Sequence, residues 1–206
     1  VANVSNSNIV ARNWIFGDGS TLSNTTAGVF NKKYLTAQTY TASLQVVTDS
    51  GCISTVNQQT IKVNPLPIPA FTLPSICLPD GRGSFTNQST IADNSEALFS
   101  YSWNFGDPND PTTSTLREPT HKYTALGPVN VQLKITSKDA CVDSLTKSLT
   151  TIYPWPKASF SATPLEVCVG DAIQFRDLGD LINSGATVSW NWDLSGGTNS
   201  TLQNPT

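Results

Sequence analysis

The sequence predicts an all-β protein made of repeated β-sandwiches. Three observations support this fold class: apolar residues occur in short alternating runs, turn-forming residues separate these runs, and one pattern recurs at a fixed interval. Ser, Thr, Asn, Gly and Pro supply most of the polar residues, which is typical of many short strands joined by turns. A long, fixed interval is the mark of a repeat architecture.

Three tryptophan motifs show the repeat. Each begins 89 residues after the one before: Trp14-Ile-Phe-Gly-Asp-Gly19, Trp103-Asn-Phe-Gly-Asp107 and Trp192-Asp-Leu-Ser-Gly-Gly197. Further pairs keep the same interval, including Tyr34 and Tyr123, Leu44 and Leu133, and Cys52 and Cys141. Agreement at so many separated positions indicates one structural unit used three times.

These matches divide the chain into three parts. Residues 1–65 hold the later part of one unit without its N-terminal strands, residues 66–155 hold a complete unit, and residues 156–206 hold the early part of a third without its C-terminal strands. We expect the chain to be one part of a longer array of such units. The alternative is that the two partial units complete each other between molecules, head to tail.

Alternation predicts the strands of one unit, because side chains at every second position share a strand face. In the middle unit the alternating sets are Phe99, Tyr101, Trp103 and Phe105, then Val129, Val131, Leu133 and Ile135. Tyr40, Ala42, Leu44 and Val46 form the matching set in the first unit. An earlier strand is expected over 83–87, around Phe85, in the middle unit, and around Ile173 and Phe175 in the third unit. The last strand of the middle unit is expected over 145–152. Six or seven short strands with a buried Trp predict an immunoglobulin-like sandwich, with a small barrel as the alternative.

The turn after each Trp strand has its own chemistry. Gly17 and Gly19 allow positive φ, and Asp18 can accept hydrogen bonds from nearby backbone N–H groups. In the middle unit, Gly106 and Asp107 occupy the same positions, and a longer loop follows. Phe16 and Phe105 are expected to lie in the core with the tryptophans, and Tyr34 and Tyr123 to form the tyrosine corner of sandwich folds.

Composition excludes several classes of function. The net charge is −3 with only 12 Lys and Arg, so no basic patch for nucleic acid is expected. The sequence contains no run of about 18 apolar residues, so no membrane span is expected. Met is absent and His121 is the only histidine, which leaves little material for acid–base or metal chemistry. Asp107 and Asp110 are the candidate Ca²⁺ ligands, although turn capping explains Asp107 as well.

The motifs together resemble the PKD (polycystic kidney disease) repeat. They are Trp103-Asn-Phe-Gly-Asp107, Glu118-Pro-Thr-His121-Lys-Tyr123 and Val131-Gln-Leu-Lys-Ile-Thr136. The added Ile76-Cys77 and Cys141 are similar to the variant found in large secreted Bacteroidota surface proteins, including gliding-motility adhesins exported by the type IX route. Two positions depart from this pattern. In the first unit Lys32 occupies the position that His121 has in the middle unit, and in the third unit Ser195-Gly196 replaces the Gly-Asp pair.

The resemblance implies a tandem, elongated array of immunoglobulin-like (PKD) sandwiches that works outside the cell. It implies no catalysis and no cofactor. It suggests a stalk, spacer, adhesion or protein-contact unit of a larger cell-surface protein, such as an adhesin or gliding-motility filament. The partners would be neighbouring repeats, surface polysaccharide or other surface proteins. The alternative is a spacer or carbohydrate-binding region of a secreted glycosidase or protease.

The four cysteines suggest disulfides, and hence an oxidising, extracytoplasmic compartment. Within the complete unit the pair is Cys77 and Cys141, whose bridge would stabilise by about 4 kcal/mol in the chain-entropy account. Cys52 and Cys168 would then need partners outside residues 1–206. The competing pairing is Cys52 with Cys77.

Two proline-rich joints, 64–69 and 153–156, separate the units. Alternating Pro favours an extended, semi-rigid chain. Trp155 lies in the second joint, either packed between neighbouring units or exposed as a contact for a partner.

Overall fold

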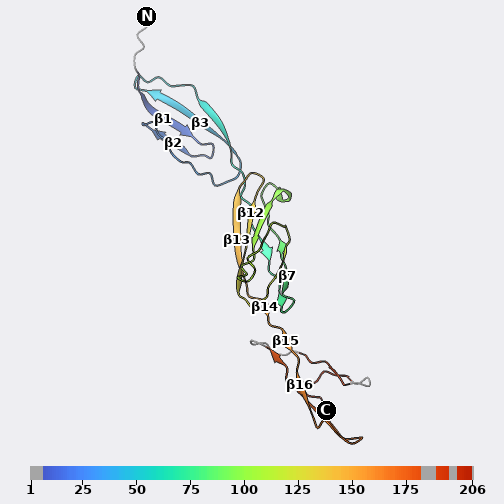
Figure 1. Cartoon of the computed structure of the whole chain (residues 1–206). Coiled ribbons are helices and arrows are strands. Elements are labelled where there is room, and N and C mark those ends of the chain that lie inside the picture. Colours follow the sequence, from blue (N-terminus) through green and yellow to red (C-terminus); the bar gives the residue numbers. More distant parts are fainter. Residues whose placement is uncertain (1–6, 182–188, 195–198, 206) are drawn as a thin grey trace. The chain divides into compact units, whose positions relative to one another are not determined.

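A computed structural model describes residues 7–181, 189–194 and 199–205 of the chain (Figure 1). The described residues form β-strands joined by turns and loops, with one short 3₁₀ helix, η1 (Glu96–Leu98). The predicted all-β class is confirmed.

The contacts of the chain group it into two compact units. One contains residues 1–69, 89–100 and 134–144, and the other contains residues 70–88, 101–133 and 145–206. The division passes through three strands of the middle repeat, over residues 100–104, 129–136 and 142–149. The repeat boundaries expected from the sequence, after residues 65 and 155, stay a proposal.

The first repeat is one antiparallel four-stranded sheet in the order β2-β1-β3-β4. Its strands are β1 (Ile9–Ile15), β2 (Thr21–Asn24), β3 (Thr39–Thr48) and β4 (Asn57–Lys62). Trp14 lies opposite Leu22 on one side and Leu44 on the other. The Trp strand is therefore central in the sheet, as the alternation predicts.

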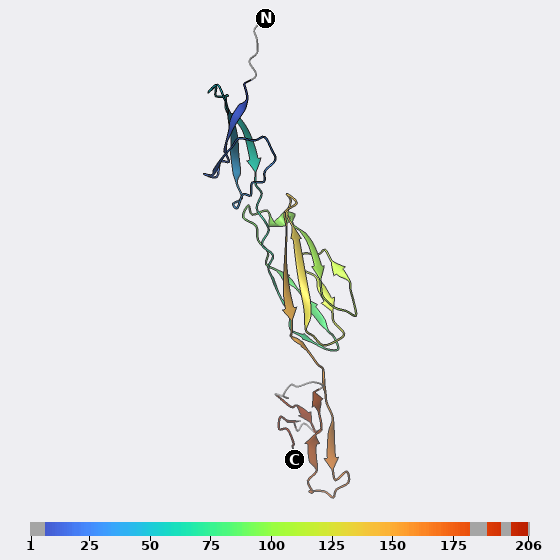
Figure 2. The same ribbon diagram turned by 90° about the vertical axis from the view of Figure 1, so that its left-hand side faces the viewer.

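The middle repeat has two layers. A four-stranded sheet has the order β10-β9-β12-β13, and three two-stranded pairs, β5-β8, β11-β7 and β14-β6, accompany it. The strands are β5 (Phe71–Thr72), β6 (Ile76–Cys77), β7 (Arg82–Ser84), β8 (Thr86–Asn87), β9 (Ser100–Asn104), β10 (Thr113–Ser114), β11 (Thr120–Lys122), β12 (Val129–Thr136), β13 (Val142–Leu149) and β14 (Ile152–Tyr153). The long strands β12 and β13 lie side by side in both views (Figure 2).

The core of the middle repeat lies between these layers. Phe71 of β5 and Phe85 between β7 and β8 both pack against Trp103 of β9. The largest fully buried side chains also include Tyr123, Val131, Leu133, Ile135 and Leu149. Two layers with a core between them confirm the predicted sandwich, and the sheet remains open at β10 and β13, which a closed barrel would not allow.

Two predicted strands of the middle repeat differ in detail. The strand expected over 83–87 is divided into β7 and β8 at the buried Phe85. The last strand begins at Val142 and not at Leu145, because the tight turn 137–141 lets the chain return directly beside β12. After Leu149 the chain forms β14, which pairs in parallel with β6.

The described residues of the third repeat form three antiparallel pairs, β16-β17, β15-β18 and β19-β20. The strands are β15 (Pro156–Lys157), β16 (Phe160–Thr163), β17 (Gln174–Asp177), β18 (Asp180–Leu181), β19 (Trp192–Asp193) and β20 (Asn199–Ser200). Phe160 and Phe175 therefore lie on neighbouring strands, and Trp192 is the first residue of β19. Residues 195–198 of its motif lie outside the described residues.

Candidate functional site

The aromatic cluster around Trp103 is the structural centre of the middle repeat. Trp103 has no solvent exposure, and its ring centroid lies 5.1 Å from that of Phe71 and 5.7 Å from that of Phe85. The Trp103 indole nitrogen donates a hydrogen bond to the Leu116 carbonyl at 2.9 Å. Because the indole is fully buried and its N–H is hydrogen-bonded, Trp103 is a core residue and is not accessible to a ligand.

The tyrosine corner occurs in two repeats with the same geometry. The Tyr123 hydroxyl donates to the Phe105 carbonyl at 3.0 Å, and the Tyr34 hydroxyl donates to the Phe16 carbonyl at 3.0 Å. Burial, with the charge of Asp107 as a second cause, raises the pKa of Tyr123 well above its usual range. Its hydroxyl therefore stays protonated and stays a donor.

We expect Tyr123→Phe to lower the free energy of unfolding of the middle repeat by about 1–3 kcal/mol, because it leaves the Phe105 carbonyl without its donor. Hydrogen exchange of β12 amides in the full chain measures this loss. Tyr34→Phe is the matched control: its hydroxyl is only partly buried, so water can replace the donor and the loss in β3 should be smaller. Equal protection of β12 in Tyr123→Phe and in the parent chain would contradict the assignment.

The aspartate of each complete Trp motif contacts a basic side chain from later in the same repeat. In the middle repeat, the His121 Nε2 atom lies 3.2 Å from an Asp107 carboxylate oxygen, with both side chains buried. In the first repeat, the Lys32 ammonium lies 2.6 Å from an Asp18 carboxylate oxygen. The interval of 89 residues between His121 and Lys32 therefore identifies two residues with one structural role.

The basic side chain, His121 or Lys32, also packs against a neighbouring aromatic ring. The His121 ring stacks on Phe105 with centroids 4.3 Å apart, and the Lys32 ammonium lies 5.2 Å from the Phe16 ring centroid. The hydrogen bond from Lys32, joined by one from Ser20, lowers the pKa of Asp18 well below its usual range. In each repeat this contact joins the turn to the segment that precedes the tyrosine.

The turn glycines adopt the predicted conformation. Gly17, Gly19 and Gly106 have φ of +80°, +87° and +66°. The Asp18 carboxylate accepts the Ser20 N–H at 3.0 Å, and the Asp107 carboxylate accepts the Asn109 N–H at 2.9 Å. Turn capping by both aspartates is thus observed.

The carboxylates of Asp107 and Asp110 both contact groups of the protein. The two oxygens of Asp107 face the Asn109 N–H and the His121 imidazole, and Asp110 accepts the Thr112 N–H at 3.1 Å. Among the described residues, no group of three or more His, Cys, Asp or Glu side chains is placed to hold a metal ion.

The other two tryptophans are less enclosed than predicted. Trp14 and Trp192 are only half-buried, and the Trp14 indole nitrogen has no hydrogen-bond partner. Phe30 packs between Trp14 and Phe16, with ring centroids 5.2 and 5.8 Å away. In the middle repeat Phe85 holds this place between Trp103 and Phe105. The alternation pattern did not identify Phe30, because it lies in a loop.

The predicted Cys77–Cys141 bridge is not formed, and all four cysteines are free thiols. Cys141 directly precedes β13, whereas Cys77 pairs with Tyr153, beyond the far end of that strand. An eight-residue strand spans about 26 Å, and a disulfide needs Cα atoms within about 7 Å. The two cysteines of the middle repeat therefore lie at opposite ends of β13.

We expect a non-reduced peptide map of the full chain to lack a Cys77–Cys141 cross-link. The exposed Cys77 thiol should react with iodoacetamide in the native protein, and Cys77→Ser should leave the unfolding transition within about 0.5 kcal/mol of the parent. Cys52→Ser provides the control at another exposed thiol. Recovery of the Cys77–Cys141 peptide would contradict this placement.

Two aromatic residues of the second joint face solvent. Trp155 is 62% exposed and Tyr153 is 49% exposed. In the first joint, by contrast, Ile68 pairs with Thr90 through backbone hydrogen bonds of 2.8 and 3.1 Å. Trp155 therefore remains a candidate contact for a partner.

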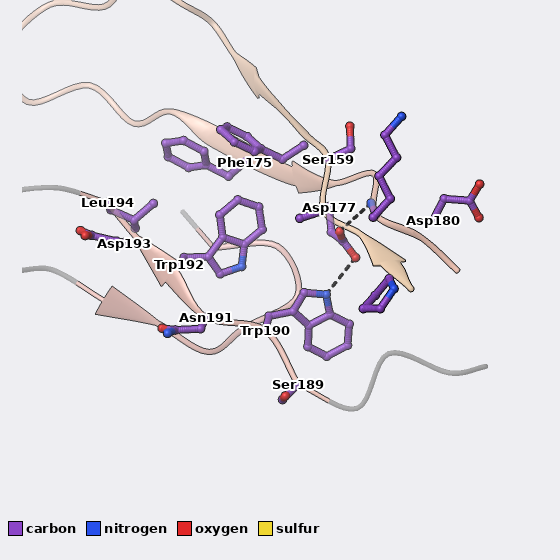
Figure 3. Close-up of a pocket in the computed structure, with 15 residues that line it drawn as sticks. Ser159, Phe175, Asp177, Asp180, Ser189, Trp190, Asn191, Trp192, Asp193 and Leu194 are labelled. Carbon is purple, nitrogen blue, oxygen red and sulfur yellow. Dashed lines mark hydrogen bonds between the residues drawn. The ribbon is translucent and has the colours of Figure 1, made fainter. Parts of the chain in front are cut away.

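An open pocket of about 620 Å³ lies in the third repeat. Its walls include Phe160, Phe175, Trp190 and Trp192, and Figure 3 shows the two indoles and Phe175 around it. The Trp190 indole nitrogen donates to the Asp177 carboxylate at 2.8 Å. The hydrogen bond from the Gly179 N–H, joined by that from the Trp190 indole, lowers the pKa of Asp177.

Comparison with known proteins gives a family match for the middle repeat. Residues 64–152 match the family model of the PKD domain. Among solved structures, the chain is similar to the fibronectin(III)-like modules of Clostridium thermocellum CbhA, with 15% sequence identity, a TM-score of 0.33, and coverage of 75% of this chain and 81% of that chain. No curated protein matches the chain.

The fold and the buried motif define an immunoglobulin-like β-sandwich in the middle repeat, and its sequence is similar to the PKD domain over residues 64–152. Domains of this family are typically extracellular and non-catalytic. No helix among the described residues has the length and apolar character needed to cross a membrane.

Proposed function

We propose that the chain is a run of three PKD-like repeats, divided after residues 65 and 155, and that it acts as a stalk or spacer outside the cell. The parent would be a larger cell-surface protein, with an adhesin or a gliding-motility filament of the Bacteroidota, exported by the type IX route, as the best match to the sequence motifs. Its immediate partners would be neighbouring repeats, and surface polysaccharide or other surface proteins would bind elsewhere on the array.

One observation carries this proposal: the first and middle repeats make matching internal contacts at equivalent positions, 89 residues apart. Tyrosine hydroxyl bonds of equal length occur in both repeats, and a basic side chain contacts the motif aspartate in each. The residues that recur along the chain therefore make contacts inside each repeat. For this reason we expect the chain to act through its length and stiffness, as a spacer does.

Small-angle X-ray scattering of the full chain tests the spacer role. If each repeat is about as long as the eight-residue strand β13, which spans about 26 Å, three repeats in series would make a rod of about 80 Å, whose radius of gyration is about 23 Å. A compact chain of this length has a radius of gyration of about 17 Å. A measured value near 17 Å would exclude a stalk.

A second candidate function is carbohydrate contact beside a secreted glycosidase or protease. The exposed Trp155 and Tyr153 favour it, because exposed aromatic rings are stacking surfaces for sugars. Titration with soluble polysaccharides should then quench tryptophan fluorescence in the parent chain and fail to do so in Trp155→Ala. Leu165→Ala, at an exposed leucine elsewhere in the chain, is the control. Equal quenching in Trp155→Ala and the parent would exclude this role for the joint.

A further inference from the structure

The strand β13 (Val142–Leu149) forms one edge of the four-stranded sheet of the middle repeat. The sheet order is β10-β9-β12-β13, and among the described residues no strand pairs with the outer edge of β13 (Figure 1). The opposite edge strand, β10, has only two residues, whereas β13 has eight. An edge strand of this length offers a row of backbone N–H and C=O groups to a further strand.

The register of the β12–β13 hairpin decides which backbone groups point outward. The Ser137 N–H donates to the Cys141 carbonyl at 2.8 Å, so these two residues form a hydrogen-bonded pair. Five residues further along each strand, Gln132 lies opposite Thr146, and the Gln132 amide donates to the Thr146 hydroxyl at 3.4 Å. Hydrogen-bonded and non-hydrogen-bonded pairs alternate along an antiparallel ladder. The groups that point away from β12 therefore belong to Val142, Ser144, Thr146 and Ser148.

The sequence of β13 is self-complementary about Leu145. In an antiparallel pair of two β13 strands with Leu145 opposite its own copy, Asp143 lies opposite Lys147 and Ser144 lies opposite Thr146. A two-fold axis makes each of these contacts twice. Opposite charges and hydroxyl pairs are favourable cross-strand neighbours. The outward N–H and C=O groups of Ser144 and Thr146 also face each other in this register, so the main-chain ladder continues across the contact.

A different register would lose this complementarity. Outward groups recur at every second residue, so the smallest shift that keeps them opposite one another is two residues. Such a shift places Leu145 opposite Asp143 in one direction and opposite Lys147 in the other. In both cases an apolar side chain faces a charge. The charge pattern of the strand therefore selects one register.

The two charged residues of β13 have no ion-pair partner among the described residues. The Asp143 carboxylate accepts the N–H of Ser144, one of the outward groups, at 2.7 Å. The Lys147 ammonium donates to the Phe71 carbonyl at 2.5 Å and lies 5.1 Å from the Phe71 ring centroid. Both side chains thus make local contacts at the edge, which they can exchange for an ionic partner.

We propose that β13 is a dimer contact, in which two copies of this chain pair their β13 strands antiparallel, with Leu145 at the two-fold axis. The sheets of the two middle repeats then form one continuous sheet. A second copy supplies the complementary strand because β13 itself carries both charges at matching positions. β4, the corresponding edge strand of the first repeat, has Lys62 as its only charged residue, so it would leave Lys147 without a carboxylate. This contact is independent of the spacer role.

Sedimentation equilibrium of the full chain tests the contact. One strand pair buries less area than a standard interface, so the expected dissociation constant is on the order of 100 μM, and the measurement should extend from about 1 to about 500 μM. The chain should pass reversibly from monomer to dimer over this range. Hydrogen exchange at high concentration should show new protection at the outward amides of β13 and none at β10. A mass that stays at the monomer value throughout would overturn the proposal.

Charge variants separate the strand contact from a loss of folding. Asp143→Lys and Lys147→Glu should each weaken dimerisation by at least about tenfold, because like charges then face each other across the two-fold axis. Mixed in equal amounts, the two variants should form a heterodimer, since each carries the charges that the other needs. A variant that had failed to fold would not regain association in this mixture.

Lys122→Glu is the matched control, because it makes the same charge change at an exposed lysine of β11, outside the sheet of β13. It should leave dimerisation within about twofold of the parent chain. Dimerisation that is equally strong in Lys147→Glu, or a mixture of the two variants that stays monomeric while the parent dimerises, would overturn the pairing. A compact scattering radius at low concentration would refute the spacer role and leave this result untouched.

Discussion

Replacing Trp103 by alanine should lower the free energy of unfolding of the middle sandwich by about 3–5 kcal/mol. The indole is fully buried among Phe71, Phe85 and Phe105, so its loss removes apolar burial and leaves a cavity. It also leaves the Leu116 carbonyl without its donor. Both effects act on the same cluster, which makes this the most damaging single truncation that we expect.

Hydrogen exchange in the full chain measures this effect repeat by repeat. Amides of β12 and β13 should lose protection in Trp103→Ala, while those of β3 should not change. The matched control is Trp14→Ala, whose indole is half-buried and makes no hydrogen bond, so the loss in β3 should be clearly smaller. Equal losses in the two variants would mean that the tryptophans are equivalent, contrary to the structure.

Much of the middle repeat was predictable, because its motif depends on local rules. Alternation placed Trp103 and Phe105 on the inner face of one strand, and both are buried. Turn chemistry placed Gly106 at positive φ and made Asp107 a cap. The fixed interval then transferred each assignment to the first repeat, where Tyr34 makes the same bond as Tyr123.

Long-range pairing was not predictable in the same way. β6 and β14 pair in parallel, which brings Cys77 beside Tyr153, and nothing in the sequence indicates that contact. The interval shows which cysteines are equivalent but not at which end of a strand each one lies. The Cys77–Cys141 pairing was wrong for this reason.

The sequence also did not predict how deeply each motif tryptophan is buried. Trp14 and Trp192 carry the same pattern as Trp103, yet both are half-buried. Burial depends on what a second layer supplies, and a pattern within one strand does not report this. Phe30, which covers Trp14 from a loop, and the open pocket beside Trp192 are two consequences.

Gly106→Ala should destabilise the middle sandwich by about 2–4 kcal/mol, although it adds only one methyl group. A Cβ at this position would lie 2.2 Å from the Asn130 carbonyl oxygen and 2.8 Å from its carbon. The φ of +66° adds a conformational penalty for any L side chain. Because the obstacle is the backbone of β12, relief requires moving a central strand of the sheet.

Gly19→Ala separates these two causes. Gly19 has a φ of +87°, yet a Cβ there would meet nothing within 4 Å. Only the conformational penalty of about 1–2 kcal/mol should remain, read from the exchange of β3 amides. If the two alanine variants cost the same, the close approach of Gly106 to Asn130 contributes nothing. We expect instead that Gly106→Ala loosens β9 and β12 together, because the tight turn after the Trp strand and the neighbouring strand occupy the same space.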